Sequence, residues 1–337
     1  MEIIIIGNRQ AYIVSEVCRH VLRMHEDINV VYVDATAPDD QLADLVIGSD
    51  IVIIQENDKK SKCWESNINK TTSVFRIGDV SLDFIWPFGG QPHFRNRMNS
   101  MFYNGPFPAA LGDAYMNRHL QANCDQNAIQ NYILSNVNSF VDLDRYFSLQ
   151  IERQRRIDRV VGSNISEIIT NRFRSERLFI NPIRPSPALM LEIMSPIDLS
   201  DFVSKPINED DVCQVYGMTP ELPLHPSVVS FFGITCMETN RQFELHANDS
   251  VSFEEYVQRY AAYSEGEEIE CGIWLSAHGS HVEAINQLNV GLSRQFGSMS
   301  ASANKAQALS LAAIGEISLA EAAWHRANEL ALKQSEF

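Results

Sequence analysis

The stretch Glu2-Ile-Ile-Ile-Ile-Gly7 decides the fold class. Four consecutive isoleucines ended by a glycine are typical of a strand that is covered on both faces in a parallel sheet. From Gln10 to Met24, apolar residues then recur at spacings of three and four, which predicts an amphipathic helix. The chain therefore begins with a buried strand that leads directly into a helix.

The same alternation continues to residue 55. The pattern predicts strands over residues 28–33 and 50–55, with a helix over residues 38–47 between them. Strand, helix, strand, helix and strand in this order are the beginning of an α/β fold. We predict an open, mostly parallel sheet with flanking helices and right-handed crossovers.

The C-terminal part of the chain has a different texture. Residues 306–314 and 319–332 predict an alanine-rich helical hairpin that turns at Gly315, and residues 271–292 show the same plan around Gly279. The spacing of 36 residues between these glycines resembles that of tetratricopeptide repeats, although two unrelated hairpins fit equally well. We predict an α/β domain over residues 1–240 and an all-α, helical repeat-like domain over residues 250–337.

The composition excludes several classes of protein. Of the 337 residues, 45% are hydrophobic and 21% are charged, which is globular and excludes a fully disordered, collagen-like or coiled-coil chain. No apolar run is long enough to cross a bilayer, and the start lacks the basic region of a signal peptide, so we expect a cytoplasmic protein. The six cysteines form no Cys-x-x-Cys pair, and we predict no metal site.

The charge is distributed unevenly along the chain. The net charge of -16 disfavours nucleic acid as a partner, because phosphate binding depends on Lys and Arg. Residues 145–184, however, hold nine arginines against four acidic residues, whereas residues 201–283 hold fifteen acidic residues against three bases. The arginine island is either a local anion site or a solvated helix face that pairs with its own glutamates.

The residues that follow the first and third strands are the first candidates for ligand binding. In a parallel sheet, ligands bind beyond the carboxyl ends of the strands, which is where Gly7-Asn8-Arg9-Gln10 and Gln55 are expected. A helix N-terminus at this edge favours an anion. The dinucleotide fingerprint Gly-x-Gly-x-x-Gly is absent, which disfavours a nicotinamide enzyme.

A long segment rich in glycine, proline and aromatic residues covers residues 86–112. Loops of this length are typically functional lids or disordered segments, and the aromatic content favours an ordered one. Its polar candidates for substrate contact are His93, Arg95 and Arg97, with ordinary surface charges as the alternative.

Seven short motifs, in this order over residues 1–235, resemble the WcbI-type capsular polysaccharide biosynthesis family. The motifs are Ile6-Gly7-Asn8-x-Gln10, Asp50-Ile-Val-Ile-Ile-Gln55, Phe84-Ile-Trp86-Pro87, Gly112-Asp113-x-Tyr115, the Arg/Glu-rich helix around residues 152–158, Arg177-Leu-Phe179 leading to Arg184-Pro185-Ser186, and Leu224-His225-Pro226. The resemblance implies an acyltransferase that uses acetyl-coenzyme A on bacterial surface glycans. It also implies a glycan or sugar-nucleotide acceptor.

Two positions depart from the pattern of that family. Arg9 stands where the family has a cysteine, and Arg184 stands where it has a histidine. Arginine stays protonated, so it serves neither as nucleophile nor as base. Both changes add positive charge at the ligand edge, and with Arg174, Arg177 and Ser186 they are our candidates for binding the coenzyme A phosphates. A buried pairing of Arg9 or Arg184 with Asp34, Asp50 or Asp113 is the structural alternative.

The predicted chemistry needs a base and an oxyanion site. We expect His225 as the base, His93 as the next candidate, and Asn8 with the N–H groups of residues 8–10 as oxyanion donors. Because the family cysteine and histidine are replaced, the alternative is a catalytically altered glycan- or coenzyme-A-binding protein. Such a scaffold would dock other polysaccharide biosynthesis proteins through its C-terminal helices. A homo-oligomer is a further option that the sequence leaves open.

Overall fold

The computed structural model describes residues 1–57, 63–96, 105–122, 125–202, 205–217, 219–236, 241–246 and 249–335. The chain divides into two compact units. Unit 1 comprises Met1–Phe84, Asp142–Thr219 and Ile234–Cys236, and unit 2 comprises Ile85–Val141, Pro220–Gly233 and Met237–Phe337. Each unit combines three separate parts of the chain. The predicted division into two consecutive domains at residues 240–250 stays a prediction.

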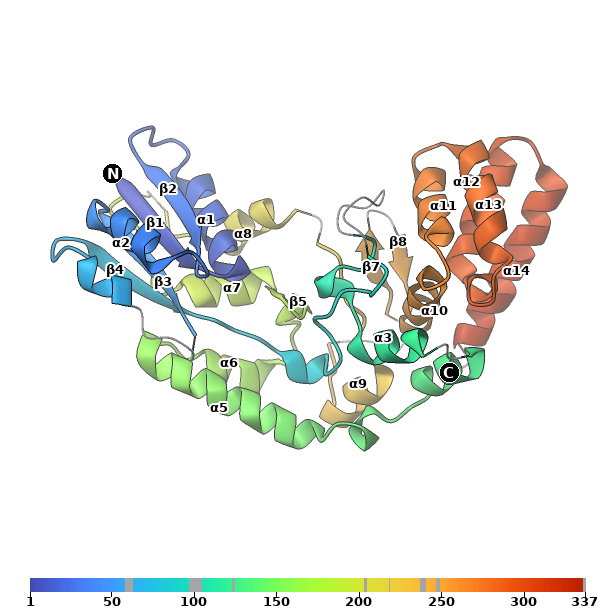
Figure 1. Cartoon of the computed structure of the whole chain (residues 1–337), viewed down its shortest axis with the longest axis horizontal. Helices are drawn as coiled ribbons and strands as arrows, with labels where there is room; N and C mark the ends of the chain where they lie inside the picture. The colour runs from blue at the N-terminus through green and yellow to red at the C-terminus, as the bar shows by residue number, and fades with distance from the viewer. Residues whose placement is uncertain are drawn as a thin grey trace. The chain divides into compact units, whose positions relative to one another are not determined.

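Unit 1 contains a parallel sheet of four strands (Figure 1). The strands are β1 (Glu2–Gly7), β2 (Asn29–Asp34), β3 (Ile51–Glu56) and β4 (Ser73–Gly78), in the spatial order β2-β1-β3-β4. In the register of the sheet, Ile4 lies between Val31 of β2 and Val52 of β3. The predicted α/β fold with a mostly parallel sheet is confirmed. β4 is an addition, since the sequence pattern did not predict it.

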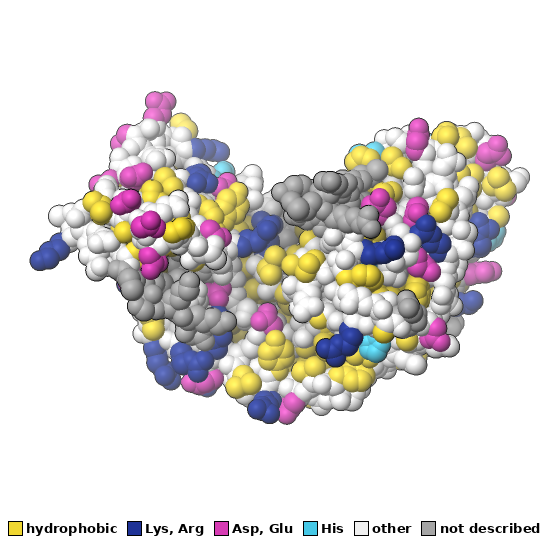
Figure 2. All heavy atoms as spheres, viewed as in Figure 1, with side chains coloured by type: hydrophobic (Ala, Val, Ile, Leu, Met, Phe, Trp, Pro, Cys, Tyr) yellow, Lys and Arg dark blue, Asp and Glu magenta, His cyan; other side chains and the backbone are white. Residues whose placement is uncertain are grey.

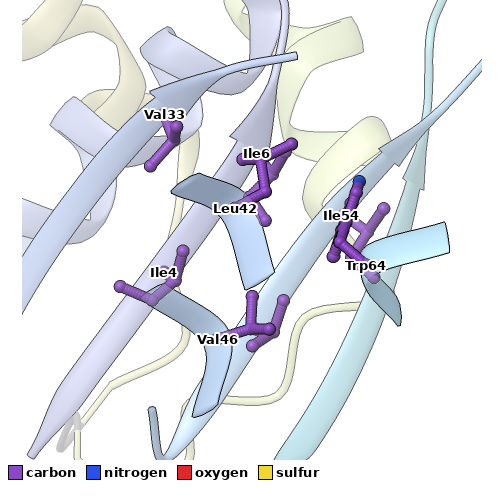
Figure 3. Close-up of a cluster of buried hydrophobic side chains, with 8 residues drawn as sticks. Ile4, Ile6, Val33, Leu42, Val46, Ile54 and Trp64 are labelled. Carbon is purple, nitrogen blue, oxygen red and sulfur yellow. The ribbon is translucent and has the colours of Figure 1, made fainter. Parts of the chain in front are cut away.

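Helices cover both faces of this sheet. From β1 the chain crosses in one direction to β2 through α1 (Arg9–Leu22), and it returns past β1 to β3 through α2 (Asp39–Ile47). Since both crossovers are right-handed, α1 and α2 lie on opposite faces. Alternate strand residues pack under α2 with Trp64, as Figure 3 shows. This cluster consists of Ile4, Ile6, Val33, Leu42, Val46, Val52, Ile54 and Trp64.

The remainder of unit 1 comes from residues 142–219. Its elements are α5 (Leu143–Val161), α6 (Ile165–Arg172), β5 (Phe179–Asn181), β6 (Arg184–Pro185), α7 (Pro187–Met194) and α8 (Glu209–Tyr216). The side chain of Asp142 caps α5, and the helix ends at Gly162 with a φ of 78°. A left-handed residue is accessible to glycine at little cost, so Gly162 separates α5 from α6, as its position in the sequence predicts.

Unit 2 is mainly helical. Its elements are α3 (Ala114–Gln121), α4 (Gln126–Ile133), α9 (Pro226–Phe232), β7 (Phe243–His246), β8 (Asp249–Val251), α10 (Phe253–Tyr263), α11 (Glu268–Ala277), α12 (His281–Leu292), α13 (Ala301–Ala313) and α14 (Ile317–Ser335). Within the described part of the chain, none of the helices is both long and apolar enough to cross a bilayer.

The C-terminal helices form the two hairpins that the sequence predicts (Figure 1). Gly279 joins α11 to α12 with a φ of 81°, and Gly315 joins α13 to α14 with a φ of 86°. Within the first hairpin, a Cβ atom on Gly272 would lie 2.5 Å from the side chain of Leu288, so these helices approach closely only because the residue is glycine. The C-terminal helical region is thus confirmed, while its kinship to tetratricopeptide repeats stays a prediction.

Candidate functional site

The order of the strands creates a crevice at one edge of the sheet. Because the chain leaves β1 toward β2 and leaves β3 in the opposite direction, toward β4, the carboxyl ends of β1 and β3 lie at a topological switch point. A pocket of about 510 Å³ opens there, within the size range of ligand sites. All of its lining belongs to unit 1: Asn8, Arg9, Gln10, Asp79, Val80, Ser81, Asp83, Gln150, Arg153, Pro182 and Ile183.

Asn8 organises the start of α1 at this pocket. Its Oδ1 accepts a hydrogen bond from the Gln10 N–H at 2.8 Å, and its Nδ2 donates to Asp79 Oδ1 at 2.8 Å. The backbone N–H of Asn8 donates to Gln55 Oε1 at 2.7 Å. The Asn8 side chain and two of the N–H groups expected as oxyanion donors are therefore occupied by the chain itself. A reacting oxygen would have to displace one of these bonds, so the oxyanion role stays a prediction.

Gln10 and Gln55 form the buried floor beneath the pocket. Gln10 Nε2 donates to the carbonyl of Val80 at 2.5 Å, while its Oε1 accepts from the Val80 N–H at 3.1 Å. Gln55 Nε2 donates to Gln10 Oε1 at 3.3 Å. A Cβ atom on Gly7 would lie 2.5 Å from Gln55 Oε1, so only glycine leaves room for this amide. The structure shows these three predicted residues joining β1, β3 and the segment after β4.

One wall of the same pocket carries the carboxylates of Asp79 and Asp83 and the amide of Gln150. Arg153 of α5 donates from Nη2 to Asp79 Oδ2 at 2.6 Å. Gln150, also on α5, donates from Nε2 to Asp83 Oδ2 at 2.9 Å. Burial raises the pKa of Asp83, and the hydrogen bond from Gln150 opposes this shift. These residues were not predicted from the sequence, because the carboxyl end of β4, a strand that the sequence pattern does not indicate, brings the segment with Asp79 and Asp83 to the crevice.

Arg9 and Arg184 provide positive charge in unit 1. The guanidinium of Arg184 lies 4.3 Å from the ring centroid of Tyr216, and its Nη2 donates to the Tyr216 carbonyl at 3.2 Å. Its Nε is buried and has no hydrogen-bond partner within the described residues. Burial lowers the pKa of Arg184, and the positive charge of Arg9 acts in the same direction. The two arginines are thus close enough to repel each other.

Within the described residues, no carboxylate forms an ion pair with Arg9 or Arg184. The two aspartates of unit 1 considered as partners are otherwise engaged. Asp34 accepts from the N–H and hydroxyl of Thr36, and Asp50 accepts from the Glu2 N–H. The structural alternative of a buried pair is therefore not observed.

The other predicted phosphate ligands have roles in local structure. Arg177 donates from Nε and Nη2 to the carbonyls of Phe179 and Ile180. Arg174 stacks over the ring of Phe173 at 4.4 Å. Ser186 caps α7 by accepting a hydrogen bond from the Leu189 N–H. The three residues are not among those that line the pocket, and their role in cofactor binding stays a prediction.

The two predicted catalytic histidines belong to unit 2 and are buried there. His225 is 6% exposed; its Nδ1 accepts from the Ser227 N–H, and its Nε2 lies 3.0 Å from the Tyr132 carbonyl oxygen. His93 is 1% exposed, and burial lowers its pKa to about 3. Burial also lowers the pKa of His225. Both rings are thus held in the core, and their catalytic roles stay predictions. Arg97 lies outside the described residues.

A small cavity of about 30 Å³ borders His225 in unit 2. Asp113 and Tyr132 also line it, and the Tyr132 hydroxyl donates to Asp113 Oδ2 at 2.6 Å. Burial raises the pKa of Asp113 to about 6. The volume is that of about one water molecule, so the predicted base does not face a substrate-sized space in this cavity.

Comparison with known proteins gives a match in structure and none in sequence. No protein-family model and no curated protein match the chain. A solved structure matches 97% of this chain and 98% of its own, with a TM-score of 0.53 and 14% sequence identity. The chain has the fold of WcbI. WcbI is described as a novel polysaccharide biosynthesis enzyme, in its native form without a disulfide bond between coenzyme A and a cysteine. The match to WcbI supports, at the level of the fold, the resemblance that the sequence motifs indicate.

Proposed function

We propose that the protein takes part in polysaccharide biosynthesis and binds coenzyme A in the pocket of unit 1. The observation that carries this proposal is Arg9, which lines the pocket at the first residue of α1 without a carboxylate partner among the described residues. The fold of WcbI and the sequence motifs support the choice of ligand. The same evidence supports a role on glycans.

The chemistry of the pocket suits a phosphate-bearing ligand. The N-terminus of a helix attracts anions through its dipole, and an arginine fork binds phosphate with two parallel hydrogen bonds. Arg9 combines both features at one position, and Arg184 adds a second positive charge near it. The pyrophosphate of coenzyme A would lie against these groups.

Calorimetry with the full-length chain and coenzyme A tests the proposal. The Arg9→Ala variant should bind about tenfold or more weakly, because a charged hydrogen bond contributes about 1.5–3 kcal/mol. Arg159→Ala is the matched control: Arg159 is an exposed arginine of α5 that does not line the pocket, and its removal should leave the affinity unchanged. Absence of coenzyme A binding by the wild-type chain would refute the proposal.

The finer proposal is acyl transfer from acetyl-coenzyme A to the hydroxyl of a glycan or sugar nucleotide, in the cytoplasm. It rests on the resemblance to the WcbI-type family. Chromatographic detection of free coenzyme A, released from acetyl-coenzyme A in the presence of sugars, is the direct assay.

A second candidate is a binding or scaffolding protein without turnover. The burial of His225, with hydrogen-bond partners at both ring nitrogens, favours this candidate, as does the arginine at position 9. It predicts coenzyme A binding without product, and a stable complex with another biosynthesis protein through α11 to α14. Turnover by the wild-type chain that His225→Ala abolishes would exclude it and support the predicted base.

A further inference from the structure

We infer that Asp83 is the proton acceptor of the unit 1 pocket, and that Asp79, Asp83 and Gln150 bind a neutral, hydroxyl-bearing acceptor such as a sugar. This inference rests on the proposed function of the pocket. It moves the catalytic base away from the two histidines of unit 2.

The hydrogen bonds around Asp83 fix its orientation. Gln150 Oε1 accepts from the Phe84 N–H at 3.3 Å, which leaves its Nε2 to donate to Asp83 Oδ2 at 2.9 Å. The amide is therefore held from both sides, and it holds the carboxylate in turn. Asp83 is half-buried and lines the pocket with Asn8 and Arg9. A positioned carboxylate within a ligand pocket is the arrangement that a general base requires.

Asp79 and Asp83 have different surroundings. Asp79 accepts hydrogen bonds from Asn8 Nδ2 and from Arg153 Nη2, and the latter is part of an ion pair. Burial raises the pKa of Asp83, the hydrogen bonds from Gln150 and Ser81 and the charge of Arg153 lower it, and the charge of Asp79 adds a small upward contribution. Asp79 is thus engaged in an ion pair, whereas Asp83 is held by a neutral amide and is the carboxylate positioned for proton transfer.

Burial raises the pKa of the Tyr146 phenol, and the negative charge of Asp83 raises it further. Near pH 7 the Tyr146 phenol therefore stays neutral, and Arg153 is engaged in its ion pair with Asp79. Asp83 is the member of this set whose raised pKa suits proton transfer.

This geometry supports acyl transfer from the thioester to the hydroxyl of the acceptor. The acceptor hydroxyl gives its proton to Asp83, and its oxygen forms a bond with the carbonyl carbon of the acyl thioester. The carbon–sulfur bond then breaks, and the coenzyme A thiolate takes the proton back from Asp83. The products are an ester and free coenzyme A.

The lining also limits the substrate class. Carboxylates and amide groups pair with hydroxyls, and Asp83, which unlike Asp79 forms no ion pair within the described residues, would repel a carboxylate of the substrate. The wall of Asp79 and Asp83 therefore favours a neutral sugar over a uronic acid. The anionic part of the co-substrate is left to Arg9.

The experiment follows release of coenzyme A from acetyl-coenzyme A by the full-length chain, with water and then neutral hexoses as acceptors, between pH 5 and 9. We expect Asp83→Asn to lower the rate about 100-fold or more, with coenzyme A affinity unchanged. In the wild type, the hydrogen bond from Gln150 lowers the pKa of Asp83. Gln150→Ala removes this bond, so the pKa of Asp83 should rise and the rising limb of the pH profile should shift to higher pH. Asp144→Asn, an exposed carboxylate on α5, is the control and should match the wild type.

The outcomes separate this inference from the proposed function. Wild-type rates in Asp83→Asn, or no release by a wild-type chain that binds coenzyme A, would overturn the role of Asp83 and leave coenzyme A binding intact. Absence of coenzyme A binding would remove the proposed function and this inference with it. Should Asp83→Asn fail to fold, the pH shift of Gln150→Ala decides, because an unshifted profile would contradict the inference.

Discussion

Gln55 Oε1, near the end of β3, accepts a hydrogen bond of 2.7 Å from the backbone N–H of Asn8, the N-cap of α1. The bond joins two neighbouring parallel strands, β1 and β3, from which the chain continues in opposite directions along the sheet. It also places the Gln55 amide against the backbone of Gly7, where a side chain has no room. The floor of the pocket is thus part of the core of unit 1.

The first prediction concerns Gly7. A methyl group at this position would lie 2.5 Å from both Ala11 Cβ and Gln55 Oε1. We expect Gly7→Ala to lower the free energy of unfolding by about 1–3 kcal/mol through overpacking, as measured by urea denaturation. Gly48→Ala is the control, since Gly48 has a φ of -101° and open space around it, and its stability should stay the same or rise slightly. Equal stability of the two variants would contradict the close packing at Gly7.

A thiol introduced by Arg9→Cys would lie at the first residue of α1. The helix N-terminus and the positive charge of Arg184 both favour a thiolate there, so we expect its pKa to be depressed. The natural comparison is Cys213, an exposed residue of α8 whose pKa is raised by burial and by two acidic neighbours. The pH dependence of alkylation by iodoacetamide, followed by mass spectrometry, should show the introduced thiol reacting at lower pH. Indistinguishable profiles would argue against an anion-binding helix end.

Asp113 makes the stability of unit 2 depend on pH. Burial raises its pKa from 3.8 to about 6, so the folded state binds more protons than the unfolded state between these values. The free energy of unfolding should therefore fall as pH rises from about 4 to about 6, with a contribution from Asp113 on the order of 2–3 kcal/mol. Asp113→Asn should remove this part of the slope in urea titrations at several pH values. A variant whose slope equals that of the wild type would show that Asp113 is not the group responsible.

Arg259 is buried without solvent exposure and joins three elements of unit 2. Its Nε donates to Glu270 of α11, and its Nη1 donates to Asp249 of β8, each at 2.7 Å. Removing one partner from a buried ion pair costs about 3–5 kcal/mol, so Arg259→Ala should destabilise unit 2 strongly in thermal or urea unfolding. Arg172→Ala, which removes an arginine paired with Glu176 and Glu192 at the surface, should cost less than about 1 kcal/mol. Similar losses in both variants would contradict this distinction.

The charge distribution along the sequence has a counterpart on the surface. Lys and Arg side chains gather along the lower left edge in Figure 2, where Figure 1 places α5. Arg155 and Arg159 are exposed on this helix, whereas Arg153 turns to Asp79 in the pocket. The arginine island is therefore in part a solvated helix face, and one of its members lines the pocket of unit 1, while its role as an anion site stays a prediction.

The sequence by itself determined the elements whose pattern is local. Short stretches of sequence are enough to predict the buried strand β1, from its four isoleucines, and the ends of the helices, from their glycines and apolar periodicity. The reason is that burial on both faces of a sheet and left-handed turns impose strict residue preferences. These signals were sufficient for the parallel sheet and for the two C-terminal hairpins. They also placed residues 7–10 at the carboxyl edge of the sheet, where the pocket of unit 1 opens.

Only the tertiary structure decided which side chains line the pocket and which are buried or hydrogen-bonded within the core. Asp83 and Gln150 are 67 residues apart in the chain, and their hydrogen bond exists only because α5 packs beside the sheet after β4. The sequence motif predicts His225 as a base, but its ring nitrogen Nε2 lies beside the carbonyl oxygen of Tyr132, which is 93 residues away in the chain. The pKa of a buried group depends on desolvation and on hydrogen bonds from such distant neighbours, so it is not predicted from the residues next to it in the sequence.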